Sequence, residues 1–278
     1  MYGESRQDIV SWDRFLLDVV KEYAQENDIS CDVISGGWIV RLKKGDGTRF
    51  IFGLDFGLNN SASKLIARDK AATSDILALE DISHVEHKLF LRPTSVGASP
   101  TGNWESISEY FHTCDGDVVC KPNLGSSGIG VARAQTQAEL EHTIQTLFSD
   151  DRAIAISPYV EMIAEYRATV LNNHVELIYK KVKEDSDDLQ FNLCGGAYAQ
   201  EEKDEKILDR VSDLALRAAR ATGITFSNID IVLDAKGDVS VLEMNSGVMF
   251  EHYAKQGAQE AQRAENVYRK ALDKLFSQ

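Results

Sequence analysis

The sequence has few of the residues that characterise fibrous, disulfide-stabilised or membrane-spanning proteins. Its 278 residues include only 4 prolines and 4 cysteines, and no two cysteines have CxxC spacing. No apolar run approaches the roughly 20 residues needed to cross a bilayer, and the opening MYGESRQDIV has no apolar signal core. We therefore expect a cytoplasmic protein with reduced thiols and no contact with a membrane.

Basic residues are also in the minority. The chain has 30 Lys+Arg against 44 Asp+Glu, a formal net charge of −14, which argues against an extended nucleic-acid surface. With 43% hydrophobic residues the composition is typical of a soluble globular protein. At roughly 150 residues per domain, the length predicts about two domains.

The spacing of apolar residues predicts an α+β fold with mostly antiparallel sheets. A helix in the first segment precedes three short strands, CDVIS, WIVRLK and TRFIFGL. Further helices are predicted over about 64–80, 136–149, 207–223 and 251–277, and Thr136 with Glu139 three residues later predicts a capping box at the start of the second. Asn172-Asn173 marks a hairpin turn, Gly223 a helix end, and the polar stretch 183–205 a mobile loop.

The strongest local motif is VVCKPNLGSSGIGV, from Val118 to Val131. Glycine backbone groups, serine hydroxyls and the preceding Lys121 together suit a polyphosphate. The lysine precedes the glycines, so this is not a P-loop. Taken alone, such a loop is more often a flexible turn.

A second motif is NIDIVLDAKGDVSVLEMN, in which Asp230 lies on one strand and Glu243 and Asn245 share a face of the next. Their oxygens suit Mg²⁺ beside phosphates. Without a cation, we expect the two carboxylates to repel each other. The alternative is that Glu243 and Asn245 only line the solvated face of a hairpin.

Three weaker signals accompany these two. They are EYRATVL with Glu165 and Arg167, FNLCGGAY with Asn192, and RDKAAT, where Lys70 opens a helix. The stretch HVEH (84–87) resembles part of a metal site, but an exposed polar stretch is the more frequent explanation. Cys120 is more often a small buried residue than a reactive thiol.

In their order along the chain, these segments resemble the ATP-grasp superfamily, and most closely the RimK-like carboxylate–amine ligases. The resemblance covers about residues 64–250 and implies two α+β lobes enclosing ATP, preceded by a short N-terminal α/β segment. The implied domains are 1–63 on the substrate side, 64–156 as the central lobe, and 157–278 as the C-terminal lobe with the metal site.

The resemblance also implies roles for individual residues. The nucleotide-binding residues would be Lys70, Lys121, Gly125, Ser126, Ser127, Gly128, Tyr159, Val160 and Glu165. The catalytic residues would be Arg167, Lys181 and Asn192, and the Mg²⁺ ligands would be Asp230, Glu243 and Asn245. Two ions are expected, and Mn²⁺ could substitute for them.

Some positions depart from the family pattern. Ser157 replaces the acidic or amide residue of many relatives in the adenine-facing segment AISPYVE, so base recognition is expected to use backbone groups around Tyr159 and Val160. Asn228 replaces the arginine of D-alanine–D-alanine ligases, which argues against that branch.

The resemblance implies an ATP-dependent ligase that joins the carboxylate of an amino acid or peptide to an amine through an acyl phosphate. An ATP-grasp phosphotransferase acting on a small molecule is the alternative, and a non-catalytic nucleotide-binding module is a weaker one. A homodimer is left open, and the sequence does not name the substrates.

Overall fold

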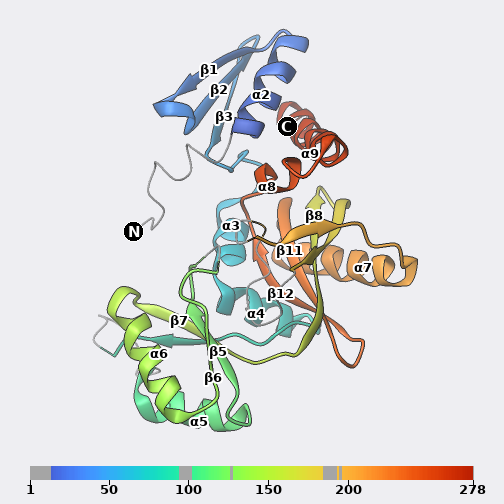
Figure 1. Cartoon of the computed structure of the whole chain (residues 1–278). Helices are drawn as coiled ribbons and strands as arrows, with labels where there is room; N and C mark the ends of the chain where they lie inside the picture. The colour runs from blue at the N-terminus through green and yellow to red at the C-terminus, as the bar shows by residue number, and fades with distance from the viewer. Residues whose placement is uncertain (1–13, 94–101, 126–127, 184–192, 194–195, 278) are drawn as a thin grey trace.

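The computed structural model describes residues 14–93, 102–125, 128–183, 193 and 196–277 (Figure 1). Three antiparallel sheets lie along the molecule, and each is covered by helices on one face. The predicted α+β architecture is therefore confirmed. None of the helices formed by the described residues is both long and apolar enough to cross a membrane.

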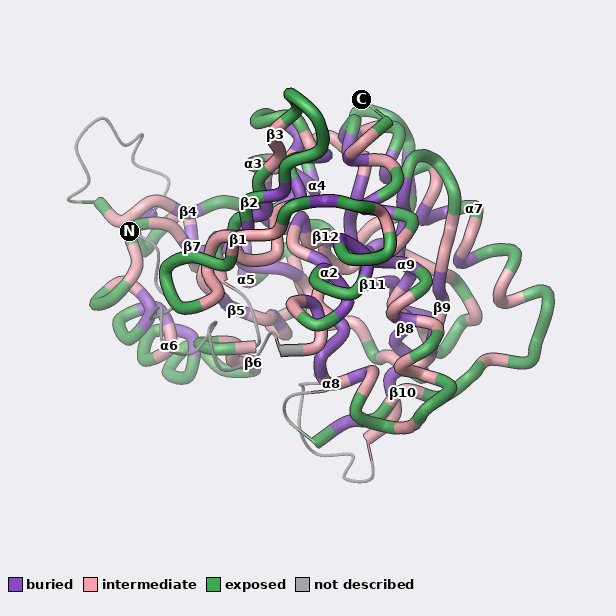
Figure 2. The backbone as a smooth tube through the Cα atoms, turned by 90° about the horizontal axis from the view of Figure 1, so that it is seen from above, coloured by how far each residue is buried: buried purple, intermediate pink, exposed green. Residues whose placement is uncertain are grey.

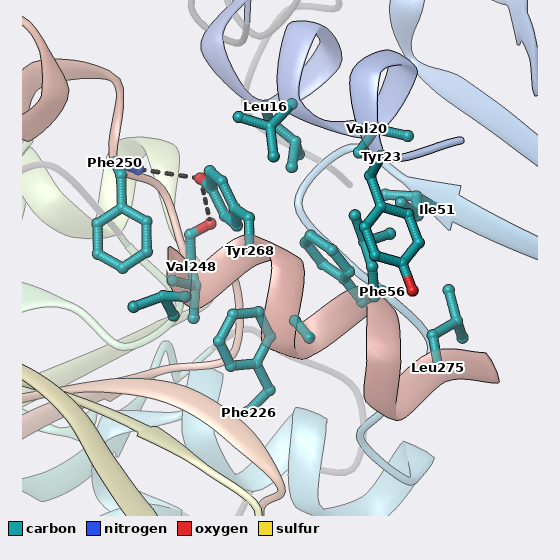
Figure 3. Close-up of a cluster of buried hydrophobic side chains, with 14 of the residues drawn as sticks. Leu16, Val20, Tyr23, Ile51, Phe56, Phe226, Val248, Phe250, Tyr268 and Leu275 are labelled. Carbon is teal, nitrogen blue, oxygen red and sulfur yellow. Dashed lines mark hydrogen bonds between the residues drawn. The ribbon is translucent and has the colours of Figure 1, made fainter. Parts of the chain in front are cut away.

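The first sheet is small and uses the three strands predicted near the N-terminus. Its order is β1 (Ser30–Ile34), β2 (Ile39–Lys44), β3 (Gly47–Phe52). Helix α2 (Arg14–Glu26) covers one face, together with α8 (Glu251–Ala254) and α9 (Ala258–Phe276) from the other end of the chain. Figure 3 shows the buried cluster where these elements meet. There the Tyr268 hydroxyl donates to Val248 O and accepts from Phe250 N, each at 3.1 Å.

The second sheet has five strands in the order β10-β9-β8-β11-β12. Their bounds are β8 Met162–Leu171, β9 His174–Val182, β10 Tyr198–Gln200, β11 Phe226–Asp234 and β12 Val239–Asn245. Helix α7 (Glu205–Thr222) packs on one face of this sheet, and buried residues recur along α7 between exposed and intermediate ones (Figure 2). Nearly every residue of β11 is buried, so both faces of the sheet are covered.

The third sheet has four strands in the order β4-β7-β5-β6, with bounds β4 Lys88–Leu91, β5 Val118–Pro122, β6 Ala132–Ala134 and β7 Ala153–Pro158. One face packs against α5 (Trp104–Thr113) and α6 (Gln137–Asp150). The capping box predicted from Thr136 and Glu139 begins α6. The opposite face carries Lys121, because strand alternation separates it from the buried Val118 and Cys120.

Packing crosses two of the predicted domain boundaries. Helices α3 (Ser61–Arg68) and α4 (Lys70–Leu79) contribute Ala67 and Leu77 to the core of the five-stranded sheet, not to that of the four-stranded one. Helix α9 packs with the N-terminal sheet, where Tyr23 Oη donates to Asp273 at 2.7 Å. The domain boundaries at residues 63 and 156 remain a prediction from the sequence.

Two predicted helices are each interrupted. The helix predicted over 64–80 breaks at Asp69, which ends α3 and caps α4, its side chain accepting from Ala72 N at 2.9 Å. The final helix breaks before Gly257, leaving the single turn of α8. Strands β4 and β10 and helix α5 were not predicted; β10 lies within the stretch expected to be a mobile loop.

Candidate functional site

Strand register brings polar side chains of four strands into rows on one face of the five-stranded sheet. One row runs Tyr179 (β9), Arg167 (β8), Asp230 (β11), Glu243 (β12), since each residue is the register partner of the next. Lys181 and Glu165 form the neighbouring row, and Asn228 and Asn245 lie on the other side. This face is opposite α7, because the alternate residues Tyr166, Ala168 and Ile229 pack in the core beneath that helix.

A buried network of four charges occupies the centre of these rows. Arg167 binds Asp230 through two parallel bonds, Nε to Oδ1 at 2.8 Å and Nη2 to Oδ2 at 2.7 Å. Lys181 Nζ lies 2.9 Å from Asp230 Oδ1 and also binds Glu165. Burial alone would raise the pKa of Asp230, but the charges of Arg167 and Lys181 hold that pKa below its ordinary value. Burial raises the pKa of Glu165, an increase that Lys181 opposes.

The expected repulsion between Asp230 and Glu243 is therefore reduced by charges of the protein itself. Arg167 and Lys181 already neutralise Asp230, which the sequence pattern did not reveal. Glu243 has no ion pair within the described part of the chain. Asn245 Nδ2 lies 3.5 Å from Glu243 Oε1 and 3.4 Å from Asp230 Oδ2, so the three predicted metal ligands are together.

Lys121 faces this network from the four-stranded sheet. Its side chain is buried, with 6% exposed, and its ammonium has no hydrogen bond or ion pair among the described residues. Burial lowers the pKa of Lys121 to about 8; Glu243 and Glu165 act against this decrease, and Lys70 adds to it. The charges of Glu243 and Glu165 thus act on Lys121 from the five-stranded sheet.

Lys70 lies at the first position of α4, where it meets the loop that follows β5. Its Nζ donates to Gly125 O at 2.7 Å, and burial lowers its pKa. Asn123, which is 2% exposed, joins the two segments: its Oδ1 accepts from Ala71 N at 3.1 Å and its carbonyl from Lys70 N at 3.3 Å. The two lysines are thus brought together although 50 residues separate them in sequence.

The remaining predicted residues are only partly described. Tyr159 and Val160 follow β7 and are half-buried; Tyr159 N donates to Asp117 O at 3.0 Å, and the Arg133 guanidinium lies over the Tyr159 ring at 3.4 Å. Gly128 has φ 73°, the left-handed region that favours glycine. Ser126, Ser127 and Asn192 lie outside the described residues.

A family profile described as a RimK-like ATP-grasp domain matches residues 67–264. The chain belongs to this family. The match includes every described residue of the rows and of the two-lysine cluster. It confirms the resemblance inferred from the motifs.

Relatives of this RimK-like ATP-grasp domain include named ligases. A protein from Enterobacter sp. (strain 638) named "Probable alpha-L-glutamate ligase" is 27% identical over 194 residues, 69% of this chain and 59% of the relative. A "Ribosomal protein bS6--L-glutamate ligase" from Salmonella paratyphi B has the same identity and coverage. The chain thus spans 59% of the length of these curated relatives.

Solved structures confirm the ATP-grasp fold. The D-alanine–D-alanine ligase of Bacillus anthracis matches with a TM-score of 0.60 at 20% identity, over 79% of this chain and 69% of that one. A bifunctional glutathione synthetase from Pasteurella multocida matches with a TM-score of 0.59 at 13% identity, over 95% of this chain and 44% of that one. At these identities the likeness shows the fold alone.

The structure decides two sequence hypotheses outside the ATP-grasp motifs, and the expectation that HVEH is an exposed polar stretch is wrong, because Val85 and His87 are buried and only Glu86 is exposed. In HVEH, the rings of His84 and His87 each bond through Nδ1 to the carbonyl two residues earlier, at 2.7 and 2.8 Å. No group of three or more His, Cys, Asp or Glu suited to a metal ion occurs in the described ranges. Cys120 is fully buried and its pKa is raised to about 12, so it is a packing residue.

Tyr179 and Asn123 were not singled out from the sequence. Tyr179 shares the face of Lys181 because two residues separate them on one strand, so alternation could have identified it. Its hydroxyl is buried without a hydrogen-bond partner in the described structure. Asn123 carries no such signal, since its role depends on how the loop after β5 meets α4.

Proposed function

We propose that this protein is an ATP-dependent ligase that joins a carboxylate to an amine through an acyl phosphate. The observation that carries the proposal is Lys121, a lysine only 6% exposed whose ammonium makes no hydrogen bond or ion pair with the described residues and lies on the side of its sheet that faces Glu243. A buried cation with no directly bound anion is costly, and the more distant charges of Glu243 and Glu165 offset only part of this cost. A polyphosphate supplies the directly bound anion.

The nucleotide would lie between the two sheets. Lys70, Lys121, Gly125 and Gly128, with Ser126 and Ser127 of the same loop, would hold the phosphates. Tyr159 and Val160 would contact the base, and Glu165 the ribose. In the described structure the Glu165 carboxylate forms an ion pair with Lys181. To bind the ribose, this carboxylate would have to accept hydrogen bonds from the ribose as well as from Lys181.

The oxygen donors of Asp230, Glu243 and Asn245 fit Mg²⁺ bound together with phosphates. Two carboxylates and one amide are too few for a cage made by protein alone, which agrees with a preference for shared phosphate ligands. Asn245 would turn its amide so that its oxygen faces the ion. When bound, Mg²⁺ would neutralise charge on the phosphate oxygens; two ions, or Mn²⁺ in their place, remain part of the proposal.

The reaction would proceed in two balanced steps. A substrate carboxylate oxygen attacks the γ-phosphorus, forming the acyl phosphate and releasing ADP. An amine then attacks the acyl carbon, the amine loses a proton, and inorganic phosphate leaves. Arg167 and Lys181 would stabilise the developing oxyanion, and Asn192 is assigned to the same step only because its segment resembles the family pattern. The names of the relatives suggest L-glutamate as one of the two substrates and a protein or peptide as the other.

The experiment is a screen of phosphate release from ATP and Mg²⁺ across amino acids and short peptides, followed by trapping with hydroxylamine. Formation of an acyl hydroxamate that depends on a carboxylate substrate supports the ligase. A stable phosphorylated product without amide would instead establish the phosphotransferase alternative. Binding of ATP without turnover on any substrate would favour a nucleotide-binding module.

A further inference from the structure

His87 lies on the same side of the four-stranded sheet as Lys121, although it belongs to no motif of the site described above. Lys88 and Phe90 face α5, since the Lys88 ammonium lies 4.7 Å from the Tyr110 ring and Phe90 packs in that core. Strand alternation therefore directs Leu89 to the opposite face, and His87, the residue just before β4, continues this alternation and lies within the electrostatic influence of Lys121. Leu89 shares its register partner Ala155 with Lys121, which confirms the side.

The imidazole of His87 presents a lone pair that nothing in the described structure uses. The residue is 3% exposed, and its Nδ1 bonds to Val85 O at 2.8 Å. Because a carbonyl can only accept, Nδ1 carries the proton and Nε2 is left as a hydrogen-bond acceptor. That Nε2 is buried and has no partner.

The ring is also fixed in place. His87 N donates to Ser74 Oγ of α4 at 3.0 Å, and Val85 N donates to Val241 O of β12 at 2.8 Å. Burial first, and the charge of Lys121 second, hold the pKa of His87 well below its ordinary value, so the ring is neutral. A rigid, neutral acceptor thus lies next to the proposed phosphate-binding lysines.

We propose that His87 Nε2 accepts a hydrogen bond from the exocyclic amino group of the bound purine and so selects adenine over guanine. This rests on the proposed ATP-binding function. The β4–β7 register ends at Lys88–Ile156, and extending it by one residue sets His87 opposite Ser157, which is 2% exposed and lies two residues before Tyr159. Ser157 has only a short hydroxyl, so His87 supplies the acceptor that a longer acidic or amide side chain would supply there. Guanine presents an oxygen at that position, and two acceptors repel.

The test compares the affinities of ATP, purine riboside triphosphate and GTP for the whole protein in Mg²⁺, by calorimetry. Purine riboside triphosphate differs from ATP only in lacking the amino group. The wild type should bind it about tenfold more weakly than ATP, the effect of one buried hydrogen bond. In His87→Leu, ATP should weaken by a similar factor and removal of the amino group should have no further effect.

Two further variants sharpen the result. His87→Gln has an amide that can turn to accept or donate a hydrogen bond, so this variant should retain ATP binding and bind GTP more tightly than the wild type does. His84→Leu removes a ring with the same bond to a carbonyl two residues earlier, and it should leave the preference unchanged. An equal loss of ATP and purine riboside triphosphate in His87→Leu would overturn the inference while sparing the proposed function. A wild type that binds none of the three nucleotides would overturn both.

Discussion

Lys121 is the residue on which the proposed site depends most. Buried lysines without a carboxylate partner are rare, because removing an ammonium from water is expensive. Lys121 sits in this state on a strand whose neighbours pack tightly. Its environment is therefore poor for folding and suitable for an incoming anion.

We predict that Lys121→Met loses ATP binding and most activity without loss of fold. Rates should fall by about a hundredfold, the usual effect of removing one preorganised charge. The thermal unfolding temperature at pH 7 should be unchanged or higher. Lys88→Met is the matched control, because Lys88 lies on β4 of the same sheet but faces α5. Wild-type turnover in folded Lys121→Met would remove the residue from the site.

We also predict proton uptake when ATP binds near pH 8. In the free protein the pKa of Lys121 is about 8, so a large fraction of the side chain is neutral there. Phosphate restores the ammonium and raises the pKa, which requires a proton from solvent. Calorimetry in buffers of different ionisation enthalpy measures this uptake. It should decline toward pH 6, where Lys121 is already charged, and an uptake that is independent of pH would contradict the assignment.

Asp230 shows the opposite case, a buried charge that the protein compensates. Asp230→Asn would leave Arg167 and Lys181 without their shared carboxylate, at a cost of about 3 to 5 kcal/mol in unfolding free energy at pH 7. Since the folded pKa of Asp230 lies below its unfolded value, the stabilisation is present above about pH 4 and is lost as the pH falls. The difference from wild type should therefore shrink in acid.

Urea titrations at pH 7 and pH 3 measure this difference. The exposed turn residue Asp238 provides the control, since Asp238→Asn makes the same chemical change without a buried partner. If the two substitutions had equal effects, the four-charge network would not contribute to stability.

At the scale of elements, the sequence predicted what local chemistry determines. The turn at Asn172-Asn173 has positive φ at both residues, Gly223 ends α7 in the left-handed region, and the Thr136 capping box begins α6. The sequence pattern did not indicate the two helix breaks, for different reasons. Asp69 is neither proline nor glycine and serves two helices at once, whereas Gly257 lies in a long polar pattern that continues on both sides.

Substitution at the α3–α4 break should affect both stability and nucleotide binding. Asp69→Ala removes the cap on Ala72 N, at a cost of about 1 kcal/mol in unfolding free energy. Because Lys70 is the first residue of α4, loosening this turn should also weaken ATP binding. Asp75→Ala, at an exposed position of the same helix, should do neither. Denaturant titration with and without ATP separates the two effects.

At the scale of the molecule, the rows of the site could be anticipated, but their electrostatics could not. Spacing alone placed Glu243 with Asn245 and Glu165 with Arg167. The neutralisation of Asp230 depends on which strands are neighbours in the sheet, and β8 lies between β9 and β11 only in the folded chain. The packing of α9 on the N-terminal sheet likewise joins residues more than 200 positions apart, as Tyr23 and Asp273 show.

The account's central claim is that two facing sheets bind ATP together with Mg²⁺ at Glu243. Calorimetric titration of ATP into wild type and Glu243→Gln, each with and without Mg²⁺, tests it most directly. Wild type should bind ATP much more tightly with the ion. Of the two predicted carboxylate ligands, Asp230 is paired with Arg167 and Lys181, whereas Glu243 has no ion pair in the described structure and is therefore available to the ion. Glu243→Gln should remain folded and lose most of that gain. An equal effect of Mg²⁺ on both proteins would contradict the claim.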